Sequence, residues 1–108
     1  MSCRLYSGAQ YFIMTTLSIV IPCFNEDKGV EQLVSKLTEL EEKIDASDEL
    51  VFIDDGSSDS TYERLNTLYK DRIARNNDIR IVKHPKNKGV GAAIKTGLSN
   101  SQGYYVAT

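Results

Sequence analysis

The sequence is poor in the residue types that build disulfide frameworks and metal centres. Its 108 residues include two cysteines and one histidine. Cys3 lies in the leading segment and Cys23 at the end of an expected strand, so a disulfide framework is not indicated. Because zinc needs three or four ligands, we interpret the lone His84 before Pro85 as a loop residue rather than a metal ligand.

Long apolar runs and an excess of positive charge are also missing. No stretch approaches the roughly 20 apolar residues that a membrane-spanning helix needs. Arg4 is the only basic residue before residues 17–24 and no A-x-A-like cleavage site follows them, which argues against a signal peptide. The formal net charge is -2, so neither nucleic acid nor an anionic membrane surface is an expected partner of the whole chain. We therefore expect a cytoplasmic chain in which any basic function is local.

The remaining composition is that of an ordinary globular domain. Hydrophobic residues make up 41% of the chain and charged residues 26%, which argues against disorder. A length of 108 residues suits one small domain and is short for a complete α/β enzyme. Residues 1–16 show no clear period, and Met14 shortly before the first strong strand indicates an N-terminal extension. The expected domain therefore spans residues 17–108.

The apolar pattern predicts strands that alternate with helices. The expected strands are residues 17–22, 50–53, 78–83 and 104–107, and the expected helices are residues 30–44, 62–69 and 90–98. Ser60 and Glu63 have the spacing of a capping box for the second helix, and Gly103 is placed as a left-handed cap after the third. Small residues on the third helix permit a close approach to the sheet. This order predicts an α/β fold with a mostly parallel, Rossmann-like sheet and flanking helices.

The turn after the second expected strand places two acids at one edge of the sheet. Residues 50–53 are apolar without alternation, which is typical of a parallel strand covered on both faces. Asp54, Asp55 and Gly56 follow, and glycine lets the backbone turn where a side chain would restrict it. Ligands of open α/β sheets bind beyond the carboxyl ends of the strands, so both carboxylates are expected to face that crevice. The alternative is that both acids only solvate and cap the turn.

Two other segments are expected at the same edge. Phe24 and Glu26 follow the first strand, where the aromatic ring would suit a ring of a ligand and the acid its polar edge. A Phe in the core beside a Glu in the first turn of a helix explains both residues equally well. Residues 86–93 bring lysines and glycines to a helix start. The backbone N–H groups and the helix dipole at such a start suit a diphosphate. A merely solvated loop is the alternative for this segment.

Known phosphate-binding and phosphoryl-transfer motifs do not fit these segments. The dinucleotide motif needs glycine where Ile94 stands, and residues 95–97 run opposite to the P-loop order. Phosphoryl transfer through an aspartyl nucleophile generally uses aspartates two residues apart, whereas Asp54 and Asp55 are adjacent. We reject all three motifs.

Three segments together resemble the nucleotide-binding half of the inverting family 2 glycosyltransferases, which have the GT-A fold. They are residues 18–26, 51–61 and 87–93, and the resemblance spans residues 17–108. Within this family the chain looks most similar to the dolichyl-phosphate mannose synthase type. The match to the motifs implies nucleotide binding by Pro22, Phe24, Asn25, Glu26, Asp54, Asp55, Ser57, Lys88 and Gly89.

The resemblance also implies how these residues share the ligand. Pro22, Phe24 and Glu26 would line the base and ribose pocket. Asp55 would accept a hydrogen bond from the base with Asp54 beside it, and Lys88 with the Gly89 turn would lie near the diphosphate. The donor would be a UDP-sugar or a GDP-sugar, and the acceptor a lipid phosphate or a growing glycan at the cytoplasmic face of a membrane.

The family also has parts that this sequence does not reach. In these enzymes the fourth strand leads to an Asp-x-Asp motif that holds a divalent metal, Mg²⁺ or Mn²⁺, and the catalytic base follows later. The sequence ends at Thr108, before all of them, so we expect a donor-binding fragment with no catalytic or metal residue of its own and no sugar transfer. A non-catalytic nucleotide-binding module, or a scaffold subunit that self-associates through its unfinished sheet, is the alternative.

Overall fold

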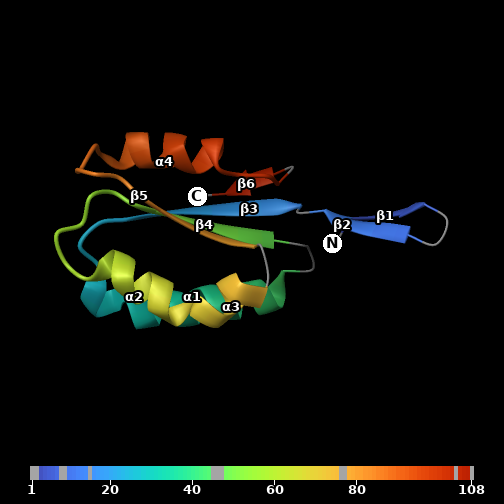
Figure 1. Ribbon diagram of the computed structural model, residues 1–108, viewed down its shortest axis with the longest axis horizontal. Helices are drawn as coiled ribbons and strands as arrows, with labels where there is room; N and C mark the ends of the chain where they lie inside the picture. Colours follow the sequence, from blue (N-terminus) through green and yellow to red (C-terminus); the bar gives the residue numbers. More distant parts are fainter. Residues whose placement is uncertain are drawn as a thin grey trace.

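The computed structural model describes residues 3–7, 10–14, 16–44, 48–75, 78–103 and 105–107. Four parallel strands in the order β5-β4-β3-β6 form the central sheet, and helices cover both of its faces (Figure 1). The elements are β1 (Cys3–Ser7), β2 (Gln10–Met14), β3 (Leu17–Cys23), η1 (Asp27–Gly29), α1 (Val30–Lys43), β4 (Asp48–Asp54), α2 (Thr61–Leu68), α3 (Lys70–Arg75), β5 (Ile79–Lys83), α4 (Val90–Ser99) and β6 (Tyr105–Ala107). The predicted α/β class and the parallel sheet are confirmed.

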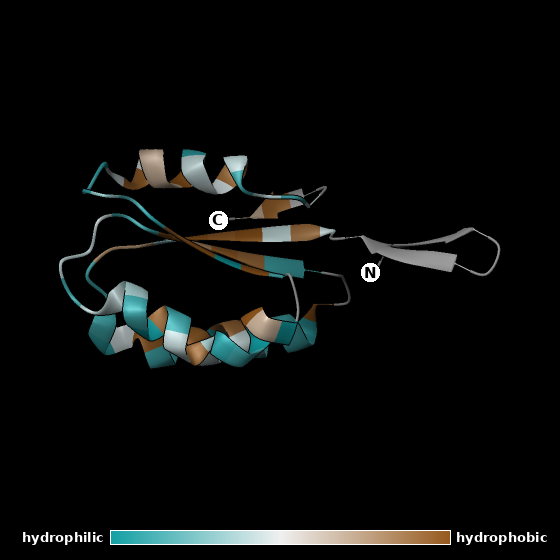
Figure 2. Cartoon of the chain, viewed as in Figure 1, coloured by the Kyte–Doolittle hydropathy of each residue, from teal (hydrophilic) through white to brown (hydrophobic). Residues whose placement is uncertain are grey.

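The centre of the core is β4, which is apolar on both faces. Leu50 and Phe52 pack in one cluster with the side chains of α1 and α2, while Val51 and Ile53 pack in a second cluster beneath α4. All four are fully buried, as the unbroken apolar run predicted. Figure 2 shows the same arrangement, with largely hydrophobic strands between helices, among which α1 and α2 carry most of the hydrophilic residues.

On one face of the sheet, α4 approaches closely through its smallest residues. Ala93 is fully buried, and a Cβ added to Gly97 would lie 2.2 Å from Cγ1 of Val20 on β3. Val90 and Leu98, which the helical pattern placed on the same apolar side, are 64% and 50% exposed. The predicted close approach is therefore correct, but only the small residues make it, because they alone fit between helix and sheet.

The second expected helix is found as α2, and a short helix that was not expected, α3, follows it. Its apolar pattern ran through Leu68 and Tyr69, but α2 ends at Leu68 and α3 begins at Lys70. Tyr69 lies in the break with its side chain buried against Phe52, at 5.3 Å between ring centroids. Leu68 is 42% exposed and Tyr69 only 4%, so the expectation that both residues share the buried face is wrong.

Both predicted helix caps differ from the structure. No side-chain capping bond forms from Ser60, and the carboxylate of Asp59 accepts hydrogen bonds from the backbone N–H of Thr61, at 2.9 Å, and from its hydroxyl. Gly103 does not have a left-handed backbone. It is needed for a close approach instead, because an added Cβ would lie 2.7 Å from Oγ of Ser18 on β3.

A buried carboxylate at the amino end of the sheet holds the segment between α4 and β6. Glu49 is fully buried and accepts hydrogen bonds from the Ser18 hydroxyl, the Arg80 guanidinium and the backbone N–H of Gln102. The pairing with Arg80 compensates the charge that burial would otherwise penalise. This contact joins β3, β4 and β5 to the segment that leads to β6.

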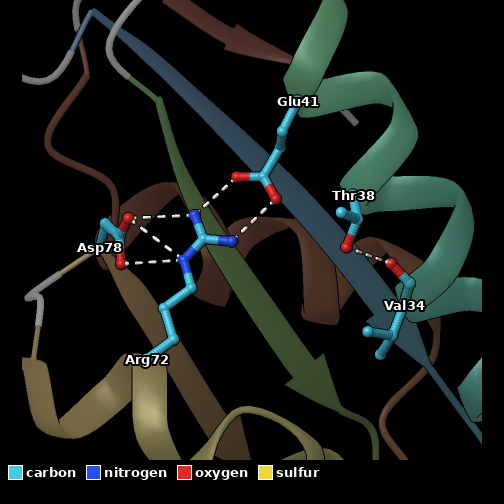
Figure 3. Close-up of polar contacts among 5 residues, drawn as sticks. All are labelled: Val34, Thr38, Glu41, Arg72 and Asp78. Atoms are coloured by element: carbon cyan, nitrogen blue, oxygen red, sulfur yellow. Dashed lines mark hydrogen bonds and ion pairs between the residues drawn. The ribbon is translucent and has the colours of Figure 1, made fainter.

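A second charged cluster joins the helices on the opposite face from α4 (Figure 3). Arg72 on α3 donates to both carboxylate oxygens of Glu41 on α1, at 2.8 and 2.6 Å, and to Asp78 before β5. Burial alone would raise the pKa of Glu41, but Arg72 outweighs it and holds this pKa below its usual range. Burial and the nearby Glu41 raise the pKa of Asp48 to about 7.

An antiparallel hairpin of β1 and β2 precedes the domain. It forms a separate two-stranded sheet in which Cys3 is paired with Met14, and Figure 1 shows it beyond the amino end of β3. Sequence analysis predicted no element there, because these residues show no clear period. The fourth expected strand is confirmed as β6, which pairs with β3 at Leu17, Ser18 and Ile19.

Candidate functional site

A pocket of about 270 Å³ opens beyond the carboxyl ends of β3 and β4, beside the first turn of α4. This is the place where ligands of open α/β sheets bind. Its lining residues are Pro22, Cys23, Phe24, Asp55, Asn87, Gly89, Val90 and Ala93. The structure thus brings four of the predicted nucleotide-binding residues together at one pocket: Pro22, Phe24, Asp55 and Gly89.

Asp55 supplies the carboxylate on the pocket wall. It follows β4 directly, and its two oxygens accept hydrogen bonds from the backbone N–H groups of Lys88 and Gly89, each at 2.9 Å. Nδ1 of His84 lies 2.8 Å from Oδ1 of the same carboxylate. Asp55 therefore connects the end of β4 to the start of α4, and both of these segments border the pocket.

These contacts keep Asp55 ionised. Burial by itself would raise the pKa of this carboxyl, since a charge is less well solvated inside the protein. The hydrogen bonds from His84, Lys88 and Gly89 outweigh burial and hold the pKa of Asp55 below its usual range. A hydrogen-bond acceptor with negative charge is therefore available on the pocket wall at neutral pH.

Asp54 lies on the other face of the sheet. Successive side chains of a strand point to opposite faces, so Asp54 is on the side of Phe52 and the α1–α2 layer while Asp55 is on the side of α4. Asp54 is fully buried and accepts a hydrogen bond from the Ser57 hydroxyl. Its Oδ2 has no hydrogen-bond partner among the described residues, and it does not line the pocket.

Asn25 and Ser57 join the loop after β3 to the loop after β4. The backbone N–H of Asn25 donates to the Ser57 hydroxyl at 2.8 Å, and Oδ1 of Asn25 accepts from the backbone N–H of Ser58 at 3.0 Å. Asn25 has a left-handed backbone with φ of 51°, which asparagine tolerates better than most residues. These two predicted site residues thus shape the rim through loop contacts.

Glu26 is held by its backbone rather than by its carboxylate. Its N–H donates to Oγ1 of Thr61 at 2.8 Å, and the following N–H of Asp27 donates to Asp59 at 3.2 Å. The side chain of Glu26 is exposed beside the pocket rim. Asp59 and Thr61 therefore fix the loop after β3 as well as the start of α2.

The apolar walls of the pocket are open to solvent. Phe24 is 46% exposed and Val90 is 64% exposed, and Pro22 and Ala93 complete the apolar lining. Lys88, on the loop before α4, has an exposed side chain. The pocket thus offers flat apolar surfaces beside one carboxylate, with a cation on the adjacent loop.

Two glycines let the surrounding loops adopt this shape. Gly56 has φ of 73° and Gly89 has φ of 95°, in a region that residues with a side chain rarely adopt. A Cβ on Gly56 would lie 2.3 Å from the backbone N of Asn87 and 2.3 Å from the backbone carbon of Lys86. The predicted turn at Gly56 is confirmed, and the structure adds that this turn supports the loop before α4.

Sequence analysis missed three residues near the pocket. His84 follows β5 as a loop residue, as expected, but it is only 6% exposed and contacts Asp55. Asn87 and Cys23 line the pocket, and burial together with the charges of Asp54 and Glu26 raises the pKa of the Cys23 thiol to about 12. The available signal was position, since His84 and Cys23 both stand where a strand ends at the binding edge.

Metal-ligand clusters and membrane-spanning helices are both absent from the described part of the chain. No group of three or more His, Cys, Asp or Glu side chains in it is arranged to hold a metal ion. None of the helices in the described ranges is long and apolar enough to cross a membrane. The carboxylates near the pocket do not form a ligand set for a divalent ion.

Fold and pocket define an α/β domain with a pocket at the carboxyl edge of a parallel sheet. The chain belongs to glycosyl transferase family 2, whose family model matches residues 18–108.

Curated relatives include transferases that act on lipid phosphates. The dolichyl-phosphate beta-glucosyltransferase of Saccharomyces cerevisiae is 34% identical over 91 residues, which cover 82% of this chain and 27% of the relative. The undecaprenyl-phosphate 4-deoxy-4-formamido-L-arabinose transferase of Proteus mirabilis is 32% identical, with 85% and 27% covered. The chain therefore spans about a quarter of the length of these relatives. Dolichyl-phosphate transferases are among the relatives as expected, with glucose rather than mannose as the named sugar in this case.

Solved structures of two transferases share the fold. Staphylococcus aureus TarS matches with a TM-score of 0.67 and 21% identity over 85% of this chain and 26% of the TarS chain. Glucosyl-3-phosphoglycerate synthase from Mycobacterium tuberculosis matches with a TM-score of 0.61 and 27% identity over 85% of this chain and 32% of that chain. The latter was solved with Mn²⁺, UDP and glucosyl-3-phosphoglycerate bound. The GT-A fold expected from the sequence is confirmed.

Proposed function

We propose that this domain binds the nucleotide of a UDP-sugar or GDP-sugar and forms the donor-binding part of a glycosyltransferase that acts on a lipid phosphate or a growing glycan. The site is the pocket between the ends of β3 and β4 and the first turn of α4. Family membership and the lipid-phosphate relatives support the reaction class and the acceptor. A location at the cytoplasmic face of a membrane is part of the same proposal.

The observation that carries the proposal is the carboxylate of Asp55 on the same pocket wall as the apolar residues Pro22, Phe24 and Val90. Uracil and guanine each present a ring N–H, which such a carboxylate accepts with a charge-assisted hydrogen bond. The faces of the base would contact Phe24, Pro22 and Val90, whose exposed apolar surfaces suit a flat ring. A volume of about 270 Å³ is small for a ligand site, so the pocket suits the base while the rest of the donor extends over the rim.

The remaining predicted site residues have supporting roles in this proposal. Glu26, which is exposed and close to Phe24 in the chain, would bind the ribose hydroxyls. Lys88 would bind the diphosphate: its backbone N–H donates to Asp55, while its side chain is exposed just before α4. Asn25, Ser57 and Asp54 hold the two loops together beneath the ligand. No step through a metal ion is proposed for the described residues.

Nucleotide titration tests the proposal. Calorimetry and thermal unfolding are measured with UDP and GDP, each with and without Mn²⁺, and with ADP and CDP as comparators. We expect UDP or GDP to raise the melting temperature and to bind more tightly than ADP and CDP. The ring N–H that uracil carries between two carbonyls, and guanine between a carbonyl and an amino group, is missing from adenine and cytosine. Equal weak binding of all four nucleotides would contradict base recognition by Asp55.

A further inference from the structure

His84 links the pocket carboxylate to α4. Its backbone N–H donates to the carbonyl oxygen of Asp54 at 2.8 Å. Nδ1 of its ring lies 2.8 Å from Oδ1 of Asp55, and Nε2 lies 2.8 Å from Oγ1 of Thr96 on α4. The ring is therefore fixed at both nitrogens and is almost completely buried.

The partners determine which ring nitrogen carries the proton. An ionised carboxylate only accepts hydrogen bonds, so Nδ1 of His84 must donate to Asp55. The Thr96 hydroxyl both donates and accepts, so in the neutral ring it donates to the unprotonated Nε2. The opposite tautomer would set the lone pair of Nδ1 against Oδ1 of Asp55, which is repulsive.

The two oxygens of Asp55 differ in how fully they are used. Oδ1 accepts from His84 and from the backbone N–H of Lys88, whereas Oδ2 accepts from the backbone N–H of Gly89. A carboxylate oxygen accepts about two hydrogen bonds. The described contacts therefore occupy Oδ1 and leave acceptor capacity on Oδ2.

We propose that His84 is a positioning residue for base recognition, which holds Oδ1 of Asp55 so that Oδ2 is presented to the ring N–H of the base. This inference rests on the proposed function, because it concerns the same pocket. Thr96 sets the orientation of the imidazole from α4, and the imidazole sets the rotation of the carboxylate. Without the Nδ1 donor, the carboxylate is free to rotate toward whichever donors remain, and a bound base must then order it again.

Three variants at this position separate positioning from packing. The amide nitrogen of His84→Asn replaces Nδ1 and retains the donor to Asp55, whereas that of His84→Gln replaces Nε2 and retains only the contact with Thr96. His84→Ala removes both. We expect His84→Gln and His84→Ala to raise the Kd for UDP or GDP by about tenfold, and His84→Asn to recover most of the affinity at a temperature where all three are folded.

Two threonines on helices form a matched pair, in which Thr96→Val is the test and Thr38→Val is the control. Thr96→Val removes the hydroxyl that orients His84 and is expected to raise Kd by a few fold. Thr38→Val removes a hydroxyl that bonds to the carbonyl of Val34 on α1, away from the pocket, and should leave Kd unchanged. If His84→Ala is folded and binds as tightly as the wild type, or if His84→Asn binds as weakly as His84→Ala, His84 does not position Asp55.

A ligand-free measurement keeps this test separate from the proposed function. Nitrogen-15 spectra of the imidazole should show the proton on Nδ1, and the carboxyl pKa of Asp55 should rise in His84→Ala and His84→Gln but not in His84→Asn. The other tautomer, or an unchanged Asp55 titration in all three variants, overturns the proposal even if nucleotides bind. Failure of the wild type to bind any nucleotide, with the expected tautomer and titrations, overturns the proposed function and leaves the contact between His84 and Asp55 established.

Discussion

Replacement of Gly56 by alanine tests whether the turn after β4 sets the shape of the pocket. Gly56 has φ of 73°, and a left-handed backbone costs a residue with a side chain about 1–2 kcal/mol. The added Cβ would also lie 2.3 Å from backbone atoms of Lys86 and Asn87, and relief of such an overlap costs about 1–3 kcal/mol. We therefore expect Gly56→Ala to lower the free energy of unfolding by about 2–5 kcal/mol.

The same change should weaken nucleotide binding beyond its effect on folding. The loop that must move away from Gly56 continues into Lys88 and Gly89, whose N–H groups hold Asp55. Thermal unfolding measures the first effect, with a fall in melting temperature of at least about 8 °C. Calorimetry with UDP, below the melting temperature of the variant, measures the second, expected as about a tenfold rise in Kd.

Gly91→Ala is the matched control for this substitution. Gly91 lies in the first turn of α4 on the same side of the molecule, and an added Cβ would have no neighbour within 4 Å. Alanine in a helix is more stable than glycine by about 0.5–1 kcal/mol, so this variant should melt at the same temperature as the wild type or slightly above it. If Gly56→Ala unfolds and binds like Gly91→Ala, the close approach of the two loops does not exist in solution.

Three other measurements test the carboxylates. Asp55→Asn should raise the Kd for UDP or GDP by about tenfold or more, because Asp55 lines the pocket. Asp59→Asn should mainly lower the melting temperature, because Asp59 caps α2. Equal affinities of the two folded variants in calorimetry would exclude the contact between Asp55 and the base. The folded chain retains a proton on Asp48, whose pKa is raised to about 7, while the unfolded chain releases it near pH 4. Stability contributed by this proton is therefore lost as pH rises from about 4 to 7. The melting temperature of the wild type should decline over this pH window, and that of Asp48→Asn should not. If the two melting temperatures depend on pH in the same way, Asp48 is not the source of the decline. Finally, incubation with labelled UDP-glucose or GDP-mannose, Mn²⁺ and a lipid phosphate should give binding without transfer by this chain, since no group of three or more His, Cys, Asp or Glu side chains in the described residues is arranged to hold the metal ion; robust transfer would overturn this reasoning.

Much of the fold could be read from the sequence because its signals are local and repeated. An unbroken apolar run is sufficient to predict that β4 is covered on both faces, and the alternation of strands with helices is sufficient to predict a parallel sheet. The position of Asp55 at the binding edge follows from the same pattern, because it comes immediately after that strand. A left-handed turn at Gly56 was also predictable, since glycine adopts it without a steric penalty.

Boundaries and caps were less predictable because neighbouring side chains compete for the same role. Asp59, Ser60 and Glu63 all have groups that cap a helix, and only the packing of the loop after β3 against Asp59 selects among them. Tyr69 lies between α2 and α3 and packs its ring against Phe52 on β4. Neither contact has a signal in the local sequence.

What the sequence by itself determined is the order of elements, the central buried strand and the edge at which the acids lie. Only the tertiary structure decided that His84 and the start of α4 hold Asp55 and that Glu49 and Arg80 are paired inside the sheet. The physical reason is that periodicity is a property of consecutive residues, whereas these contacts join residues about 30 positions apart along the chain. Such contacts exist only after the strands have aligned, so no single stretch of sequence encodes them.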